Sequence, residues 1–279
     1  MLRGFIDRNK ALCNWIEARL PETFTRSLLY RHELAVADAM NGRRGAVVVD
    51  IGGGRGAPFA RHRRNPQDAL IVGIDILPAP LAENRSIDLR VAADASRSIP
   101  LKDASVDVVA TRSVLEHLSG SGAIFGEIHR VLRPGGVCLH VFPTGYAPFA
   151  LINRLLPNAL ARRLLHTLFP EWASECGFRA YYNDCHFPEI VRRHSAAGFA
   201  VSRIEFRYYQ SIYFKFFVPF YLISLTYDLA LYALDVRRLA CQILIVGRKP
   251  AGEAAAADSS RALELAHDVG DRAGVALPG

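Results

Sequence analysis

The sequence has few cysteines, and none of them forms a C-x-x-C pair. Their number is odd and they are scattered along the chain, at Cys13, Cys138, Cys176, Cys185 and Cys241. Disulfide frameworks and zinc ribbons need paired or regularly spaced cysteines, so neither is expected, and a reducing cytoplasmic location is predicted. Cys176, Cys185 and His186 lie near one another but lack a regularly spaced fourth ligand. No metal site is therefore predicted.

Long uncharged runs are also missing. The most apolar segment, residues 212–234, has its longest uncharged run from Phe216 to Tyr227, which is 12 residues. A spanning helix needs roughly 18–20 such residues. The first 20 residues carry charges every few positions and contain no apolar core, so no secretory signal is expected.

Lysine is scarce as well, with four lysines against 30 arginines. The formal net charge of +7 and the pI near 9.3 are values that nucleic-acid-binding proteins share. An arginine bias of this kind also follows from the base composition of coding DNA. The sequence shows no basic stripe interleaved with aromatic residues, so no nucleic-acid partner is predicted.

Short apolar runs and helical stretches alternate regularly between residues 46 and 142. The runs are almost continuously apolar, as in strands buried on both faces: AVVVDI, LIVGIDI, IDLRVAAD, VDVVAT and GVCLHVF. Strands that alternate with helices indicate right-handed βαβ units and a parallel sheet. Residues 1–40 are predicted to be helical and amphipathic, and GFAVSRIEFRYY and ACQILIVGRK add two later strand candidates.

The first apolar run continues directly into glycines, in VVVDIGGGRG at residues 47–56. Bare backbone at Gly52, Gly54 and Gly56 permits a tight turn, and lets a ligand lie against N–H groups at the positive end of a following helix. A nucleotide-like cofactor is therefore expected. The glycines alone do not exclude a dinucleotide, because Gly52, Gly54 and Ala57 also match the G-x-G-x-x-A fingerprint.

The motifs around the glycines favour one class of cofactor. The pattern hhhDhGxGxG is followed by VGIDI, VAADAS, IPLKDASVDVVATRSVLEHL and EIHRVLRPGGVCLHVF. In these motifs, over roughly residues 46–142, the chain resembles the class I S-adenosylmethionine-dependent methyltransferases. The resemblance implies a doubly wound, Rossmann-like α/β fold with a seven-stranded sheet of order 3-2-1-4-5-7-6.

The same resemblance divides the chain into three parts. Residues 1–42 are expected to form an N-terminal helical cap. Residues 43–250 would form the methyltransferase domain, with apolar helical insertions at 143–185 and 210–238. The Ala-rich segment 251–279 lacks aromatic residues and is predicted to be disordered.

The resemblance also implies which residues bind S-adenosylmethionine. The glycine loop would cradle the cofactor on its backbone, and the carboxylate before it would orient the loop. The carboxylate that closes the second strand would hold the ribose, and the one that ends the third strand would meet the adenine. The tip of the fourth strand would contribute backbone near the methionine arm. The residues concerned are Asp50, Gly52, Gly53, Gly54, Gly56, Asp75, Ile76, Asp94, Ala95 and Arg112.

Two of these carboxylates also have purely structural explanations. Asp94 precedes the sequence SRS two residues later and could cap a helix N-terminus. Asp75 precedes Pro78 and could be a turn carboxylate.

A general base is needed only if the acceptor must lose a proton, because the methyl group on a sulfonium is already activated. His117, in LEHL after the fourth strand, is the predicted catalytic residue, since imidazole titrates near neutral pH. A packing role for this histidine is the alternative. His140, His186 and Tyr146 are weaker candidates, from segments expected to border the acceptor pocket.

The acceptor is predicted to be small, lipid-like or lipid-linked. ATRS stands where amino-methyltransferases of nucleic acids have Asp or Asn, two prolines and an aromatic residue, and the paired glutamates of protein arginine methylation are missing. The predicted reaction is methyl transfer to oxygen or carbon. The alternatives are an NAD(P)-dependent oxidoreductase and a non-catalytic S-adenosylmethionine-binding protein, and the oligomeric state is left open.

Two apolar segments predict peripheral contact with the inner face of the cytoplasmic membrane. In residues 151–170, leucines recur every four positions and basic residues lie on the opposite arc, which is typical of an interfacial helix. Residues 212–234 contain only Lys215 and Asp228 as charges. Both segments follow strands whose carboxyl ends should face the ligand side of the sheet. For 212–234, packing within the protein is the alternative.

Overall fold

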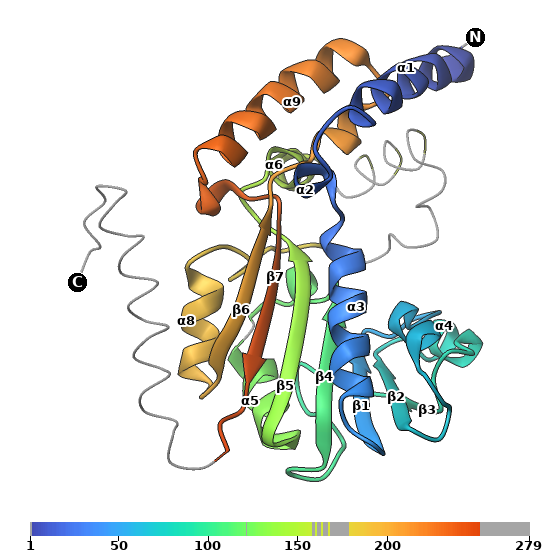
Figure 1. Ribbon diagram of the computed structural model, residues 1–279, viewed down its shortest axis with the longest axis vertical. Helices are drawn as coiled ribbons and strands as arrows, with labels where there is room; N and C mark the ends of the chain where they lie inside the picture. The colour runs from blue at the N-terminus through green and yellow to red at the C-terminus, as the bar shows by residue number, and fades with distance from the viewer. Residues whose placement is uncertain are drawn as a thin grey trace, which may run out of the picture.

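The computed structural model describes residues 2–251, apart from residues 121, 158, 159, 161, 162, 164–166 and 168–178. The described residues form a seven-stranded sheet of order β3-β2-β1-β4-β5-β7-β6. The strands are β1 (Ala46–Ile51), β2 (Ala69–Asp75), β3 (Leu89–Ala92), β4 (Val106–Arg112), β5 (Leu132–Pro143), β6 (Ala200–Arg207) and β7 (Gln242–Arg248). The expected order is confirmed (Figure 1).

The sheet is parallel except for its last strand in sequence. β1, β2, β3, β4 and β5 pair in parallel, whereas β7 runs antiparallel to both β5 and β6. The ends of β1, β2, β4, β5 and β6 therefore lie at one edge of the sheet, where ligands bind in doubly wound folds. The predicted direction of β6 is confirmed.

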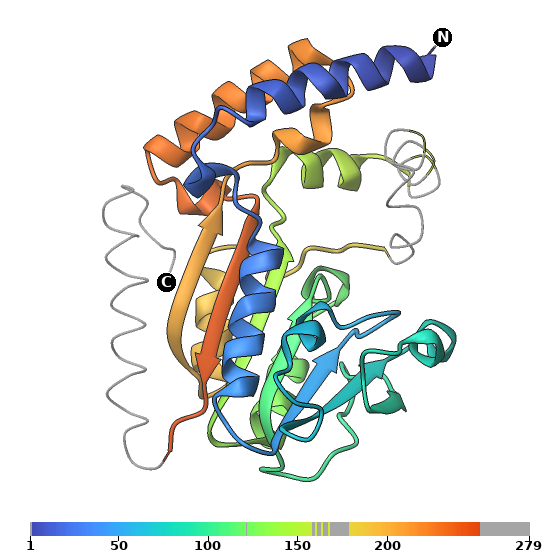
Figure 2. The ribbon, with the colours of Figure 1, turned by 45° about the vertical axis from the view of Figure 1, so that its right-hand side comes forward.

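Helices cover both faces of the sheet. The helices and 3₁₀ turns are α1 (Leu2–Glu17), α2 (Glu22–Thr25), α3 (Leu28–Asn41), η1 (Pro58–His62), α4 (Pro78–Glu83), η2 (Leu115–His117), α5 (Gly122–Val131), α6 (Pro148–Leu155), α8 (Glu189–Ala196), η4 (Ser211–Phe214), α9 (Val218–Ala233) and η5 (Arg237–Leu239). α3 crosses one face, and α5 and α8 cover the other (Figures 1 and 2).

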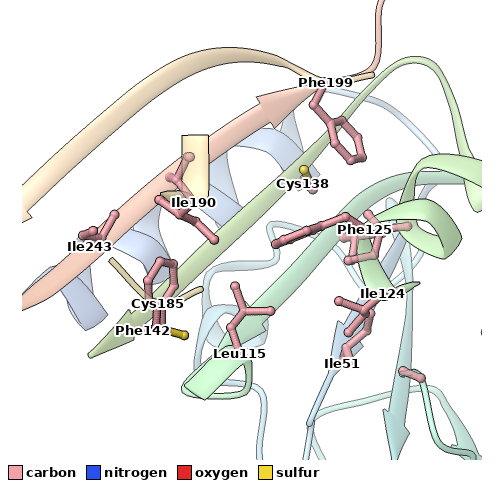
Figure 3. Close-up of a cluster of buried hydrophobic side chains, with 14 of the residues drawn as sticks. Ile51, Leu115, Ile124, Phe125, Cys138, Phe142, Cys185, Ile190, Phe199 and Ile243 are labelled. Atoms are coloured by element: carbon pink, nitrogen blue, oxygen red, sulfur yellow. The ribbon is translucent and has the colours of Figure 1, made fainter. Parts of the chain in front are cut away.

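The larger apolar core lies between the sheet and the pair α5 and α8. Figure 3 shows side chains of this core, among them Phe125 of α5, Ile190 of α8 and Phe142 of β5. On the opposite face, Val36 and Met40 of α3 pack against the inner strands. Alternation along β5 divides its side chains between these two cores, because successive residues of a strand point to opposite faces.

The prediction of a helix directly after the glycine loop is wrong. The loop leads only into the short 3₁₀ turn η1, which has Pro58 at its start. α3, which precedes β1 in sequence, contacts η1, β4, β5 and β1 on this face of the sheet. The loop therefore offers backbone N–H groups without the dipole of a long helix behind them.

α1 and α9 lie side by side beyond the end of the sheet (Figures 1 and 2). Between them is a third core, to which α1 contributes Cys13 and α9 contributes Tyr221, Leu225 and Leu231. One face of α9 thus packs within the protein, as the alternative interpretation of residues 212–234 predicted. None of the helices in the described part of the chain combines the length and the apolar character that a membrane span requires.

The first insertion begins with α6, which ends at Leu155, just before Pro157. A continuous helix over residues 151–170 is therefore wrong, because proline disfavours helical backbone at the residue before it. Arg162, Leu164, His166 and Leu168 of the predicted amphipathic pattern lie outside the described residues, as do Cys176 and the Ala-rich tail from residue 252.

Candidate functional site

The glycine loop turns sharply at the end of β1. Gly52 and Gly54 have φ values of +76° and +39°, in the left-handed region that side chains disfavour. The Gly52 N–H donates to the Ile74 carbonyl at 2.7 Å, which ties the loop to the end of β2. A Cβ at Gly52 would also overlap the side chain of Val114. Both backbone conformation and packing therefore require glycine at this position.

Asp50 lies beneath the loop and is buried. Burial raises its pKa to about 7, although the nearby Arg112 opposes the shift. A Cβ at Gly53 would lie 3.2 Å from Asp50 Oδ2, so the carboxyl group contacts the underside of the loop. The orienting role of Asp50 stays a prediction.

Asp75 ends β2 and bonds to two loops at once. Its Oδ2 accepts the Gly54 N–H at 2.9 Å, and its Oδ1 accepts the Leu77 N–H at 2.8 Å. The turn explanation of Asp75 is thus visible in the structure, and the same contacts place the carboxylate beside the glycine loop. Ile76 follows with 54% of its surface exposed, so its side chain is open to an apolar ligand.

Asp94 follows β3 and organises the next turn. Its Oδ1 accepts bonds from the Ser96 N–H at 3.0 Å and the Ser96 hydroxyl at 2.6 Å. Arg97 Nε lies 3.3 Å from Asp94 Oδ2, and Ala95 is buried in the larger core. These contacts make Asp94 the cap of a turn, and the helix N-cap proposed as its structural alternative is wrong, because no helix lies among the described residues between β3 and β4. Its contact with adenine stays a prediction.

The backbone changes direction abruptly where β4 ends. Arg112 is exposed there, and the next residue, Ser113, has a φ of +54°, which is uncommon for a residue other than glycine. The Ser113 N–H donates to the Val141 carbonyl at 2.9 Å, so β5 supports this turn. Backbone strain of this kind is concentrated at functional sites.

His117 is half-buried in η2, directly after this turn. Its Nδ1 lies 3.0 Å from the Arg179 carbonyl, which can only accept, so Nδ1 carries the proton of the neutral ring. Burial lowers the pKa of the imidazole. The ring is therefore neutral at pH 7, with the lone pair on Nε2, as a general base requires.

Glu116 is a buried acid that the sequence reasoning passed over. Its Oε2 has no hydrogen-bond partner among the described residues, and burial raises the pKa of the carboxyl group to about 8. Its Oε1 lies 4.0 Å from His117 Nε2. A glutamate within the apolar sequence SVLEHL was the signal that could have revealed a neutral carboxylic acid next to the predicted base.

A cavity of about 430 Å³ lies beyond the ends of β4 and β5. It is lined by Ser119, Gly120, Gly145, Tyr146, Arg154, Tyr182, Asn183, Asp184, His186 and Arg193. The rings of Tyr146 and His186 lie 5.0 Å apart, so the structure brings these two weaker candidates to one cavity. Sequence reasoning missed Arg154 and Arg193, since neither belongs to a motif.

The prediction that His140 borders the acceptor pocket is wrong. His140 is fully buried between the sheet and α5, where it contacts Phe125 and His194. Its position on β5 directs the side chain into the core rather than to the edge of the sheet. Cys185 is buried too, and Cys176 lies outside the described residues.

The predicted cofactor residues fit a nucleoside ligand in a strand-edge site. Gly52 and Gly54 expose backbone at the end of β1, and Asp75 brings a carboxylate to the same loop. A Cβ at Gly56 would meet nothing within 4 Å, which leaves room against the backbone. Close backbone approach and a carboxylate for ribose hydroxyls are what such a site needs.

Comparisons with known proteins agree with this geometry. A family model described as a methyltransferase domain matches residues 49–140. A demethylmenaquinone methyltransferase from Beutenbergia cavernae is 35% identical over 182 residues, which cover 59% of this chain and 75% of that protein. A probable S-adenosylmethionine-dependent methyltransferase from Mycolicibacterium smegmatis is 35% identical over 119 residues, or 39% of this chain and 42% of that protein.

The chain spans about 42% of the length of the first curated relatives that it matches. Among solved structures, geranyl diphosphate C-methyltransferase from Streptomyces coelicolor with bound S-adenosyl-L-homocysteine has a TM-score of 0.51. The identity is 15%, and the alignment covers 79% of this chain and 78% of that one, which shows a shared fold. Together with the demethylmenaquinone methyltransferase match, the glycine loop and its carboxylates give the conclusion that the chain belongs to the class I S-adenosylmethionine-dependent methyltransferases.

Proposed function

We propose that this protein transfers the methyl group of S-adenosylmethionine to an oxygen or carbon of a lipid-like or lipid-linked acceptor at a membrane surface. The observation that carries the proposal is an exposed apolar surface on α1, α6 and α9, beside the carboxyl ends of the strands. A second observation, the polar cavity beyond β4 and β5, supports a site for the acceptor's reacting end.

Exposed apolar side chains occur on all three helices, and together they are called the exposed apolar surface here. They are Phe5, Leu12, Trp15, Leu151, Ile152, Leu155, Phe220, Leu222, Ile223, Leu229 and Tyr232. α9 exposes no charged side chain, because its single charge, Asp228, is buried and accepts bonds from the backbone of Gln210 and Ser211. Exposed apolar surface of this extent is typical of interaction sites.

A membrane is the partner that we propose for this surface. Arg3 and Arg8 lie exposed on α1 near Phe5 and Leu12, together with one exposed acid, Asp7. Basic residues next to exposed aromatic and aliphatic side chains favour anionic headgroups together with the acyl boundary. An acceptor that resides in a bilayer would then reach the cavity without leaving the membrane surface.

The cavity supplies hydrogen-bond donors, and acidic neighbours balance the charge of one of its two arginines. Arg193 donates to Asp184 at 3.0 Å and lies 2.9 Å from Glu189, so its charge is largely balanced. Arg154 at the rim adds a second guanidinium. Donors of this kind suit the polar end of an amphipathic acceptor, and α6 continues from them with exposed Leu151 and Leu155.

The bound cofactor would supply a methyl group that is already activated on sulfur. The residues of this chain would hold the acceptor atom in line and exclude water. His117 would accept a proton on Nε2 if the acceptor is a hydroxyl or an acidic carbon. Burial would keep the Glu116 carboxyl group neutral, so that it adds no negative charge beside the reacting atoms.

Activity is tested with a methyl-labelled cofactor and a lipid extract, followed by mass spectrometry of the labelled product. Labelling of a lipid-soluble product supports the proposal. Calorimetry with S-adenosylhomocysteine measures cofactor binding separately from turnover. Tight binding without turnover on any extract would contradict the proposed acceptor class.

Membrane contact is tested by flotation with anionic liposomes. The double variant Phe220→Ser, Ile223→Ser removes side chains that are 51% and 70% exposed, so we expect it to fold but to bind liposomes at least tenfold less. Leu89→Ser is the matched control, since Leu89 is 50% exposed on β3, away from α9 (Figure 1). Equal flotation of the double variant, or no flotation of the wild type at low salt, would remove the membrane from the proposal.

A further inference from the structure

Three metal-ligating side chains meet in the larger core, away from the glycine loop. Cys138 and His140 come from β5, and His194 comes from α8. One ligand atom from each lies within 4.8 Å of the other two, and all three residues are fully buried. Figure 3 shows Cys138 next to Phe125 and Phe199, which close this part of the core.

In both histidines, Nδ1 makes a hydrogen bond and Nε2 does not. His194 Nδ1 donates to the Ile190 carbonyl at 2.8 Å, and His140 Nδ1 lies 2.8 Å from the Thr111 hydroxyl. The Nε2 atoms of both rings are buried without a partner in the part of the chain that the structure describes. A buried polar atom without a partner costs roughly 1–3 kcal/mol, so two of them in one cluster point to a missing ligand.

This arrangement matches how proteins prepare histidines for metals. A ligating imidazole usually gives its other N–H to a carbonyl or hydroxyl oxygen, which fixes the tautomer and aims the lone pair. Thr111 and the Ile190 carbonyl thus occupy the positions of orienting partners for Nε2 ligation.

The backbone of β7 closes the cluster from the other side. A Cβ at Gly247 would lie 2.9 Å from Cys138 Sγ and 3.2 Å from His194 Cδ2, so glycine is needed for this approach. With metal–nitrogen bonds of about 2.0 Å and metal–sulfur bonds of about 2.3 Å, the ligand atoms around a three-coordinate metal are about 3.5–3.8 Å apart. To reach this range, the widest pair of ligand atoms has to move inward by about 1 Å when the metal binds.

Charge selects the kind of metal. Among the described residues, no carboxylate belongs to the cluster, so its single anionic ligand would be a thiolate from Cys138, whose proton is released to solvent when the metal binds. A divalent ion would leave one positive charge in an apolar core, whereas a monovalent ion with one thiolate is neutral. We propose that Cys138, His140 and His194 form a buried site for Cu(I), a soft ion that thiolate and imidazole ligands favour. The site would join β5 to α8 and is independent of the proposed methyl transfer.

The test is Cu(I) binding to the full-length protein under reducing conditions, in competition with a chromophoric Cu(I) chelator. We expect one Cu(I) per chain, and at least a hundredfold loss of affinity in Cys138→Ser. Cys241→Ser is the matched control, because Cys241 is a buried free thiol outside this cluster, and its affinity should equal that of the wild type. Equal losses in both variants would overturn the proposal.

X-ray absorption of the Cu(I)-loaded wild type keeps the test independent of variant folding. The proposed site gives one sulfur and two nitrogen neighbours around copper. Coordination by two or more sulfurs, or no stoichiometric binding, would overturn the site. So would a crystal structure grown with Cu(I) in which a water molecule bridges the two Nε2 atoms.

Discussion

Replacing Glu116 by glutamine should stabilise the protein at alkaline pH. Glu116 is buried, and its pKa of about 8 means that the folded state keeps a proton which the unfolded chain releases near the ordinary value of 4.5. The folded state therefore binds more protons than the unfolded state between these values. Stability contributed by this group is complete below about pH 4.5 and is lost as the pH rises through about 8.

The size of the effect follows from the two pKa values. The interval from 4.5 to about 8 corresponds to at most about 4–5 kcal/mol of unfolding free energy at alkaline pH. Water entry around the ionised carboxylate reduces this value, so we expect Glu116→Gln to gain about 2–3 kcal/mol over the wild type at pH 8.5. At pH 4.5 the two proteins should differ by less than about 1 kcal/mol.

The assay is urea unfolding at several pH values from 4.5 to 8.5. Glu127→Gln is the control of opposite sign, because hydrogen bonds from Arg130 lower the pKa of Glu127 to about 2. That variant should lose stability relative to the wild type above pH 4.5. The unfolding free energy of Glu116→Gln should still depend on pH, because Asp50 has a pKa of about 7. If the difference between Glu116→Gln and the wild type does not grow with pH, Glu116 is not a buried neutral acid.

Four further substitutions test the site. Asp75→Ala should weaken S-adenosylhomocysteine binding by about 1.5–3 kcal/mol in calorimetry, because charge-assisted bonds to the ribose and to the Gly54 N–H are lost; an unchanged affinity in a folded variant would place the cofactor elsewhere. His117→Ala should lower turnover by about 10²–10⁴ and leave cofactor affinity within twofold, and an unaltered rate would assign His117 to packing. Gly52→Ala should lower unfolding free energy by about 2 kcal/mol or more, since its Cβ overlaps Val114 at a φ of +76°. Gly56→Ala should remain within about 1 kcal/mol of the wild type, because its Cβ meets nothing; similar losses in both glycine variants would contradict the packing argument.

Local patterns determined much of the fold in advance. Strands buried on both faces must be almost continuously apolar, which is why AVVVDI and GVCLHVF could be located and their order assigned from the family resemblance. Gly52 and Gly54 were identifiable because a left-handed backbone at a strand end needs glycine. These features depend on neighbours in sequence, so they can be read without coordinates.

Tertiary packing decided what sequence neighbours do not encode. Glu116 and His117 are adjacent, yet one is buried and the other half-buried, because the surrounding segments cover them unequally. His140 entered the core instead of the pocket because its register on β5 points toward α5.

Contacts between residues far apart in the sequence were the hardest to predict from it. Cys138 and His194 are 56 positions apart and meet only because α8 packs on β5 through the larger core. α1 and α9, from opposite ends of the described chain, share a core that hides half of an apolar segment and leaves the other half exposed. An apolar pattern in the sequence shows that a helix must bury one face. Which segment covers that face, and which apolar side chains remain exposed, is determined by the complete three-dimensional arrangement.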